Sequence, residues 1–197
     1  MGERQIFQPL TKEDRITVVL YRIGIVLSAV ILSGLAYLLA AGPAPAIGRS
    51  ADVLGYGLYA SVGMSVLFIH LYIRKFKKFL IGLYGVSLFC LAALLVPGKG
   101  SRVGGLTQVA YGPLFLLPLS GCLGFVTAKE AFCFRLVEGY VLALLMPLFL
   151  LLAAGGLLPG RSGAICLIVV AGLLVLFTLR KVFQPLAYDI GDKSAYQ

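Results

Sequence analysis

The chain has 197 residues, of which 60% are hydrophobic and only 13% are charged, and its mean hydropathy is +0.99. Soluble domains have about a quarter of their residues charged, so this composition indicates an integral membrane protein without a separate soluble domain. The net charge of +9 is interpreted as a charge bias across a membrane. Nucleic-acid binding is excluded, because no basic stripe alternates with stacking aromatics on a polar surface.

Six apolar segments are long enough, or nearly long enough, to cross a bilayer, which takes about 20 residues per helix. The connectors contain either Pro and Gly or runs of basic residues, and both separate apolar spans. We therefore predict an all-α fold in which residues 1–197 form a single integral membrane domain, a bundle of six transmembrane helices. The predicted helices cover residues 16–41, 53–73, 79–96, 109–127, 137–158 and 164–179.

The first span is predicted to be a retained helix rather than a cleaved signal peptide. Its apolar run is much longer than the roughly 7–15 apolar residues of a signal sequence, and acidic residues such as Glu13 precede it. The letters TKED, residues 11–14, match the capping pattern Ser/Thr-x-x-Asp/Glu. Thr11 is therefore the predicted N-cap, and the helix begins in water before it enters the bilayer.

Basic residues are unevenly divided between the two sides of such a bundle. Thirteen of the 17 lie in the N-terminal segment, the second-to-third connector, the fourth-to-fifth connector and the C-terminal end. The positive-inside rule therefore predicts that both termini are cytoplasmic. The even number of spans independently requires both termini to lie on one side of the membrane.

Two similar segments, IFQPL at residues 6–10 and VFQPL at residues 182–186, lie near the two ends of the chain. They run in opposite senses relative to the bilayer, so they are not copies of a duplicated unit. We interpret them as interfacial anchors, because proline limits helix formation and the apolar side chains can rest on the headgroup layer. The alternative is that they pack together and close the cytoplasmic face. The predicted anchor residues are Phe7, Pro9, Phe183 and Pro185.

Few ionisable residues fall within or beside the predicted spans, so each is a candidate for function. Arg22 lies roughly 9 Å along the first span from residue 16, and it either snorkels to the headgroups or pairs with Glu138. His70 is the only histidine, which excludes a haem held by two histidines of this chain and a histidine-rich metal site. The predicted cytoplasmic-face polar cluster comprises Arg22, His70, Lys129, Glu130, Arg135 and Glu138.

The stretch TAKEAFCFR, residues 127–135, is the densest polar part of the chain. As the predicted connector between the fourth and fifth spans, it is an amphipathic turn at the membrane surface, a docking surface or a headgroup contact. Cys133 within it is expected to be a free thiol in a reducing compartment. No histidine is near it in the sequence, so nothing marks it as an activated nucleophile.

No catalytic residue, metal site or cofactor is predicted. The four cysteines form no C-x-x-C pair, which argues against a disulfide framework and against a cysteine-based zinc site. The chain contains no H-E-x-x-H, no G-x-S-x-G and no P-loop. The middle of each span is apolar, which argues against ion transport, although a broken fourth helix containing Pro113 and Pro118 could offer backbone carbonyls to an ion.

Three stretches carry a resemblance to a known family: TKEDRITVVLYRIGI (residues 11–25), FVTAKEAFCF (125–134) and RKVFQPLAYDIGDKSAY (180–196). The combination resembles an uncharacterised bacterial integral membrane protein family, domain of unknown function 2301. The resemblance implies a multi-pass protein of the bacterial inner membrane, or of a thylakoid membrane if the source is photosynthetic. It implies no reaction and no catalytic residue.

Three classes of function remain open from the sequence. The leading hypothesis is a non-enzymatic accessory component that assembles or stabilises another membrane complex, with its contact surface on the cytoplasmic rim. The alternative is a carrier or channel for a small neutral or lipid-like solute. A weaker alternative is an enzyme that acts on a lipid or quinone through Arg22, His70 and Glu138. The expected partners are the lipid bilayer and another membrane protein or complex.

Overall fold

The computed structural model describes residues 11–41, 45–71, 73–95, 111–158 and 160–190, and these residues contain helices and no strand. Six helices are long and apolar enough to cross a membrane, which confirms the predicted all-α bundle. A short 3₁₀ helix precedes the fourth of them, and a one-turn helix follows the sixth. The elements are α1 (Lys12–Ala41), α2 (Pro45–Phe68), α3 (Arg74–Leu95), η2 (Gly112–Leu116), α4 (Leu117–Phe134), α5 (Val137–Ala154), α6 (Gly160–Val182) and α7 (Ala187–Ile190).

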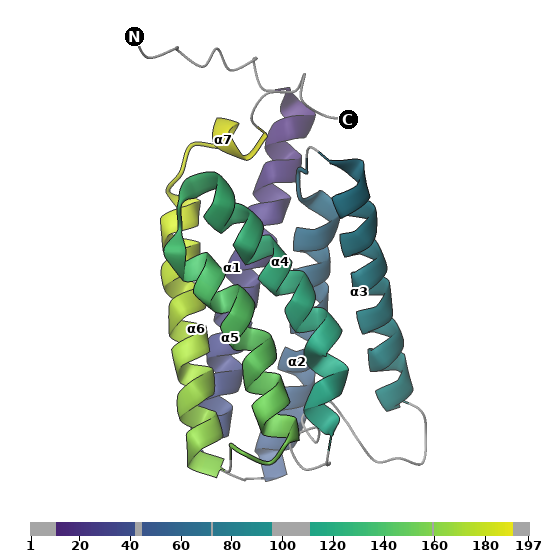
Figure 1. Cartoon of the computed structure of the whole chain (residues 1–197), viewed down its shortest axis with the longest axis vertical. Helices are drawn as coiled ribbons and strands as arrows, with labels where there is room; N and C mark the ends of the chain where they lie inside the picture. Colours follow the sequence, from purple (N-terminus) through teal and green to yellow (C-terminus); the bar gives the residue numbers. More distant parts are fainter. Residues whose placement is uncertain (1–10, 42–44, 72, 96–110, 159, 191–197) are drawn as a thin grey trace.

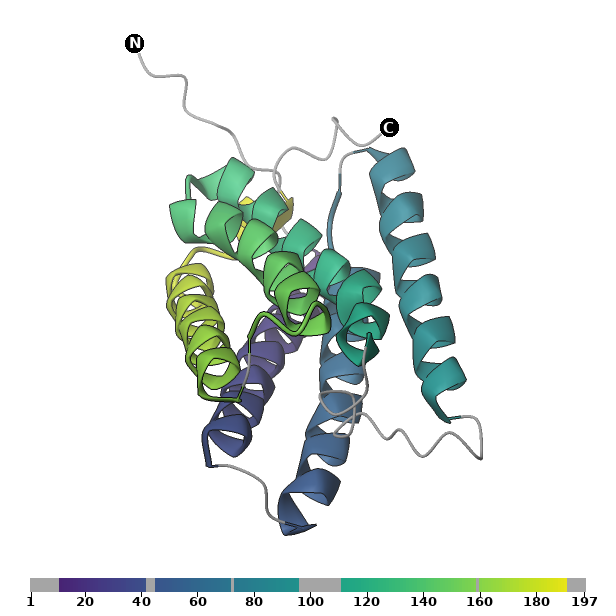
Figure 2. The same cartoon turned by 60° about the horizontal axis from the view of Figure 1, so that its bottom comes forward.

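The long helix α1 packs against both α2 and α6, so the first and last long helices of the chain are neighbours (Figure 1). α4 and α5 form a hairpin, in which α5 contacts α6 and α4 contacts α3. α3 stands at the edge of the bundle, away from α6 (Figure 2). The start of α1, the turns between α2 and α3 and between α4 and α5, and α7 all lie at one end of the bundle, here named the α7 end (Figure 1).

The beginning of α1 has the predicted cap. The Thr11 backbone N–H donates to Asp14 Oδ2 at 2.9 Å, and the Asp14 backbone N–H donates to Thr11 Oγ1 at 3.2 Å. These reciprocal bonds satisfy two of the backbone donors that a helix leaves unpaired at its start. The capping prediction is therefore confirmed.

The fourth helix extends farther than predicted. It was expected to end near residue 127, but α4 continues to Phe134, and only Arg135 and Leu136 connect it to α5. Most of the stretch read as a connector is therefore helical. The charges at 129 and 130 suggested that the chain had left the membrane, but both side chains are paired within the bundle, which allows the helix to continue. Arg135 ends the helix in the left-handed conformation, with φ of 54°.

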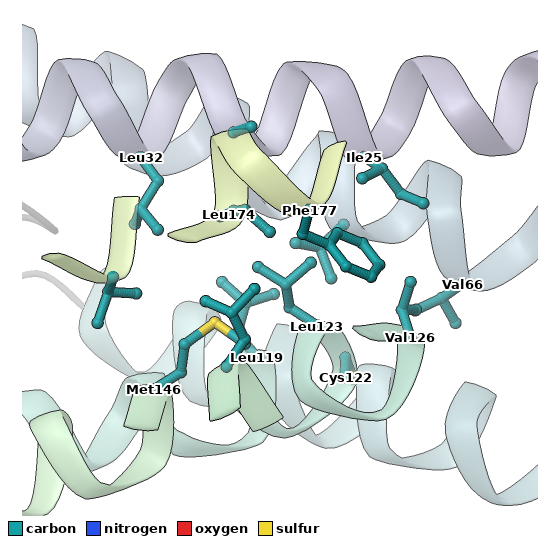
Figure 3. Close-up of a cluster of buried hydrophobic side chains, with 14 of the residues drawn as sticks. Ile25, Leu32, Val66, Leu119, Cys122, Leu123, Val126, Met146, Leu174 and Phe177 are labelled. Atoms are coloured by element: carbon teal, nitrogen blue, oxygen red, sulfur yellow. The ribbon is translucent and has the colours of Figure 1, made fainter. Parts of the chain in front are cut away.

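The interior of the bundle is apolar along most of its length (Figure 3). Leu174 and Phe177 of α6 pack toward Ile25 of α1 and Leu123 of α4. Small residues bring α1 and α2 into close contact, and the hydroxyls of Ser28 and the facing Ser61 are 2.9 Å apart. Close approach through small residues is a common way to join helices in a bilayer. The core thus fixes α1 beside α2 and α6, which positions the polar groups at the α7 end.

Candidate functional site

Charged side chains from four different helices meet at the α7 end of the bundle. The group is here named the ion cluster, and it draws on α1, α4, α6 and α7. Most of its members are buried, which is costly for charged groups unless each one is paired. The ion cluster consists of Tyr21, Arg22, Lys129, Glu130, Lys181 and Asp189.

Glu130 on α4 lies at the centre of the ion cluster and is 0% exposed. Its Oε1 accepts hydrogen bonds from Tyr21 Oη on α1 and from Lys129 Nζ, both at 2.7 Å. Its Oε2 forms an ion pair with Lys181 Nζ of α6. Both oxygens of this carboxylate are therefore engaged, and Glu130 joins α1, α4 and α6.

Lys181, in the last turn of α6, is as deeply buried as Glu130. Its ammonium group pairs with Asp189 of α7 as well as with Glu130. The same group lies over the Phe134 ring, 3.9 Å from the ring centroid. Two carboxylates and a cation–π contact replace the water that this ammonium group loses on burial.

Arg22 of α1 holds the chain that follows α6. Its Nε donates to Asp189 Oδ2 at 2.7 Å. Its two terminal nitrogens donate to three backbone carbonyls at 2.6–3.2 Å, those of Val182, Gln184 and Pro185. A helix leaves its last carbonyls without partners, and a guanidinium with five donors in a fixed fork can serve several of them. Arg22 therefore fixes the turn in which the second FQPL segment lies.

α7 is attached to the rest of the bundle through this turn. Asp189 and Ile190 are buried, and the Tyr188 ring stacks on Phe134 with a centroid distance of 6.5 Å. One turn of helix has little stability of its own. The ion pairs of Asp189 and the burial of Ile190 therefore help to give α7 its position.

The ion cluster carries a surplus of positive charge. Three cations (Arg22, Lys129 and Lys181) face two carboxylates (Glu130 and Asp189), which gives +3 − 2 = +1 with all groups ionised. Both carboxylates are held by cations, so neither is placed to act as a general base. The arrangement joins four helices and leaves a positive charge at their ends.

The pairing of Arg22 with Glu138, one of the two alternatives left open by the sequence, is not found. Arg22 pairs with Asp189, while Glu138, in the first turn of α5, accepts two hydrogen bonds of 2.8 Å from Arg180 of α6. The reason is the packing of neighbouring helices: α5 lies against α6, so the nearest cation to Glu138 comes from α6. Two adjacent cations, Arg180 and Lys181, thus serve different carboxylates.

His70 lies beside the ion cluster in a separate contact. Its Nε2 is 3.3 Å from Thr17 Oγ1 of α1. Its Nδ1 is buried and has no hydrogen-bond partner within the described part of the chain. Burial lowers the pKa of the imidazole, and the positive charges of Lys77 and Lys129 lower this pKa further. These surroundings therefore favour the neutral imidazole over the charged form.

The other predicted site residues lie at the surface or outside the described residues. Arg135, the C-cap of α4, is exposed, and so are Phe183 and Pro185. Pro185 contributes its carbonyl to Arg22 and not its ring. Phe7 and Pro9 lie outside the described residues, so contact between the two FQPL segments remains a prediction.

Sequence reasoning missed three members of the ion cluster: Tyr21, Lys181 and Asp189. Lys181 was counted only as part of the positive end of the chain, and Asp189 was not considered. The available indication was a lysine in the last turn of a span followed, a few residues after the FQPL turn, by aspartates at positions 189 and 192. Among the described residues no group of three or more His, Cys, Asp or Glu side chains could hold a metal ion, and the four cysteines are free thiols.

Comparison with known proteins places the chain in a family. A family described as "uncharacterized integral membrane protein (DUF2301)" matches residues 64–197, which is more than half of the chain and includes α4, α6 and α7 of the ion cluster. No curated protein and no solved structure matches the chain. The chain, with its six helices suited to crossing a membrane, therefore belongs to the DUF2301 family of integral membrane proteins.

Proposed function

We propose that this integral membrane protein is a non-enzymatic accessory component that assembles with, or stabilises, another membrane complex. Its contact surface is the rim of the α7 end, and that end faces the cytoplasm. The observation that carries the proposal is a set of exposed side chains directly around a rigid, buried ion cluster.

Two large aromatic side chains project from this rim. Phe132 on α4 is 81% exposed and Phe183, directly after α6, is 84% exposed. Phe132 is two residues before Phe134, and Phe183 is two residues after Lys181. The side chains of Phe134 and Lys181 contact each other. Cys133 in the last turn of α4 and Arg135, its C-cap, are also exposed. Aromatic and arginine side chains dominate the energetics of protein interfaces.

The ion cluster supports this surface from behind. Arg22 fixes the backbone carbonyl groups on both sides of Phe183, and Lys181 fixes the end of α4 through Phe134. A surface that is already ordered loses less conformational entropy when a partner binds. The rim is therefore suited to recognition of a partner.

The enzyme alternative has weaker support. It requires Arg22, His70 and Glu138 to act on one substrate, but these residues contact Asp189, Thr17 and Arg180, respectively. No observation favours the carrier or channel alternative, since both carboxylates of the ion cluster are paired and the core between the helix ends is largely apolar within the described residues.

The orientation is tested with a thiol reagent that cannot cross membranes. Cys133 is exposed at the α7 end, so it should be labelled in inverted vesicles and not in intact cells. The matched control is Ser162→Cys in a Cys133→Ser background, because Ser162 is exposed at the start of α6 on the opposite end. This control should be labelled in intact cells. The reverse pattern would overturn the cytoplasmic assignment.

The contact surface is tested by purification of the tagged chain in a mild detergent. Wild type should co-purify with one membrane protein in a fixed stoichiometric ratio. The Phe132→Ala and Phe183→Ala variants should lose that protein. Phe89→Ala is the matched control, because Phe89 is 75% exposed on the outer helix α3 and should retain it.

Two outcomes would contradict the proposal. One is the absence of any stoichiometric protein from the wild-type preparation. The other is retention of the co-purifying protein by both rim variants, or its loss only in Phe89→Ala. All variants must remain in the membrane at wild-type abundance, and this is checked on the same samples by immunoblotting.

A further inference from the structure

We propose that Arg22 and Lys181 form an anion-binding site that Asp189 occupies from within the chain, and that the phosphate of an anionic lipid headgroup displaces Asp189 and releases α7. The site is distinct from the aromatic rim, and the inference does not depend on a protein partner. It assigns a ligand class to the ion cluster and makes α7 a latch.

The first step of the argument is the geometry around the Asp189 carboxylate. One oxygen accepts from Arg22 Nε at 2.7 Å, and the other pairs with the Lys181 ammonium. A guanidinium and an ammonium that hold the two oxygens of one anion are also the groups that bind a phosphate in proteins. Asp189 therefore stands where an external phosphate would be bound.

The second step is that both cations keep their positions without Asp189. Lys181 is in the last turn of α6 and is also held by Glu130 and the Phe134 ring. Arg22 is on the long helix α1 and is also held by the carbonyls of Val182 and Gln184. Loss of one carboxylate therefore leaves a preformed cation pair.

The third step is the charge balance. With Asp189 removed, three cations face only Glu130, so the net charge of the ion cluster rises from +1 to +3 − 1 = +2. The Lys129 side chain is 13% exposed, and Arg180 is 52% exposed beside the same helix end. This surplus of positive charge favours a ligand that brings more than one negative oxygen.

The fourth step is the location, which decides between a free phosphate and a lipid. The ion cluster lies where α4 and α6 end and α5 begins. In a bundle that spans a bilayer, helix ends lie at the level of the headgroups. Basic pockets between transmembrane helices at this level are typical sites for anionic lipids. A lipid phosphate is therefore the expected ligand.

The last step is the weakness of the internal ligand. α7 is a single helical turn, and its buried anchors are Asp189 and Ile190. A segment of this length does not remain helical by its own stability. When a phosphate takes the cations from Asp189, α7 loses the two ion pairs that connect it to α1 and α6. Displacement therefore releases the turn.

The test uses the detergent-solubilised full chain and three probes: short-chain phosphatidylglycerol, short-chain phosphatidylcholine and inorganic phosphate. Asp189→Asn removes the charge of the latch and keeps its shape. It should bind phosphatidylglycerol about tenfold more tightly than wild type, because a neutral amide competes less well than the Asp189 carboxylate with the lipid phosphate for Arg22 and Lys181. Asp52→Asn, a buried carboxylate on α2 toward the opposite end, is the matched control and should bind like wild type. Lys181→Gln should lose the binding.

A second measurement uses only the wild-type chain, so it stands if Asp189→Asn fails to fold. Hydrogen exchange at the amides of residues 187–190 should become faster when phosphatidylglycerol is added, and phosphatidylcholine should have no such effect. Equal binding of phosphatidylglycerol and phosphatidylcholine, or exchange in α7 that phosphatidylglycerol leaves unchanged, would overturn the proposal. Inorganic phosphate that acts as strongly as the lipid would overturn the assignment of a lipid headgroup.

Discussion

Arg180 and Lys181 are neighbours in the chain but lie in opposite environments. The Arg180 side chain is 52% exposed and pairs with Glu138, while the Lys181 side chain is 1% exposed and joins two carboxylates. Removal of one partner from a buried ion pair leaves the other charge uncompensated, and exposed pairs contribute little. Of these two cations, Lys181 should therefore contribute more to the free energy of unfolding.

Replacement of each cation by alanine should separate these roles. Lys181→Ala is expected to lower the free energy of unfolding by about 3–5 kcal/mol. Arg180→Ala is expected to lower it by less, about 1 kcal/mol, because water reaches the half-exposed Arg180 and the buried Glu138 stays at the favourable N-terminal end of α5. Denaturant titrations in detergent measure both values. Equal losses for the two variants would contradict the burial and pairing of Lys181.

The second prediction at this scale concerns His70 and pH. Its pKa in the folded protein is below the ordinary value of 6.5, so the unfolded chain binds the proton more readily. The stabilising contribution is present above pH 6.5 and is lost as pH falls from 6.5 toward the lowered pKa. Lys77 and Lys129 strengthen this effect, and the negative charges of Asp14 and Asp189 oppose it.

The measurement compares wild type with His70→Gln, which keeps a polar side chain but does not titrate. The melting temperature of wild type should fall more steeply than that of the variant on acidification below pH 6.5. Identical pH dependence of the two proteins would show that His70 is not the group responsible.

Residue-scale prediction succeeded where the relevant contacts are local. Thr11 and Asp14 are only three positions apart, so the sequence pattern was sufficient to predict their capping hydrogen bonds. The importance of Arg22 was also predicted, since a cation within a span requires an explanation. Its partner was not, because Asp189 is 167 positions away and reaches Arg22 only through the turn after α6. That turn had been interpreted as a membrane anchor or as a contact of the other FQPL segment, and not as a partner of Arg22.

At the scale of whole helices, the apolar spans were predictable because hydrophobicity over about 20 residues is a property of each segment alone. The ends of the helices were less predictable. The second span was expected to reach residue 73, but α2 ends at Phe68 and α3 begins at Arg74. Similarly, α4 runs on through Lys129 and Glu130 because these charges neutralise each other and pair with other helices. Such pairing is tertiary information.

The contact between α1 and α2 gives a prediction at the same scale. A Cβ atom at Gly24 would lie 2.7 Å from the Ser61 carbonyl oxygen and 2.8 Å from the Ser65 backbone nitrogen. Backbone atoms cannot move aside cheaply, so Gly24→Ala should separate the two helices and cost about 1–3 kcal/mol. At Gly82 on α3 a Cβ atom meets nothing within 4 Å, so Gly82→Ala should be neutral or slightly stabilising.

Thermal unfolding of the two glycine variants in detergent checks this pair. The substitution is chemically the same in both, so helix propensity changes in the same direction and only the packing differs. A loss of stability in Gly82→Ala as large as that in Gly24→Ala would contradict the close contact between α1 and α2.

For the molecule as a whole, the ion cluster joins parts of the chain that are far apart in sequence. α1 begins the described chain, α7 ends it, and Arg22 and Asp189 connect the two across the end of the bundle. The apolar core already packs α1 against α6. The ion cluster adds a polar connection at the α7 end, where it orders the rim proposed for partner binding and holds α7 in the position proposed for the latch.

The most direct measurement of this account is a pair of double-mutant cycles that start from Arg22→Ala. Combined with Asp189→Ala, the cycle should give a coupling energy of at least about 1 kcal/mol, because the two side chains share a buried ion pair. Combined with Glu138→Ala, it should give less than about 0.5 kcal/mol, because Glu138 pairs with Arg180 instead. Strong coupling of Arg22 to Glu138 together with none to Asp189 would contradict the ion cluster and the connection it makes between the first and last helices.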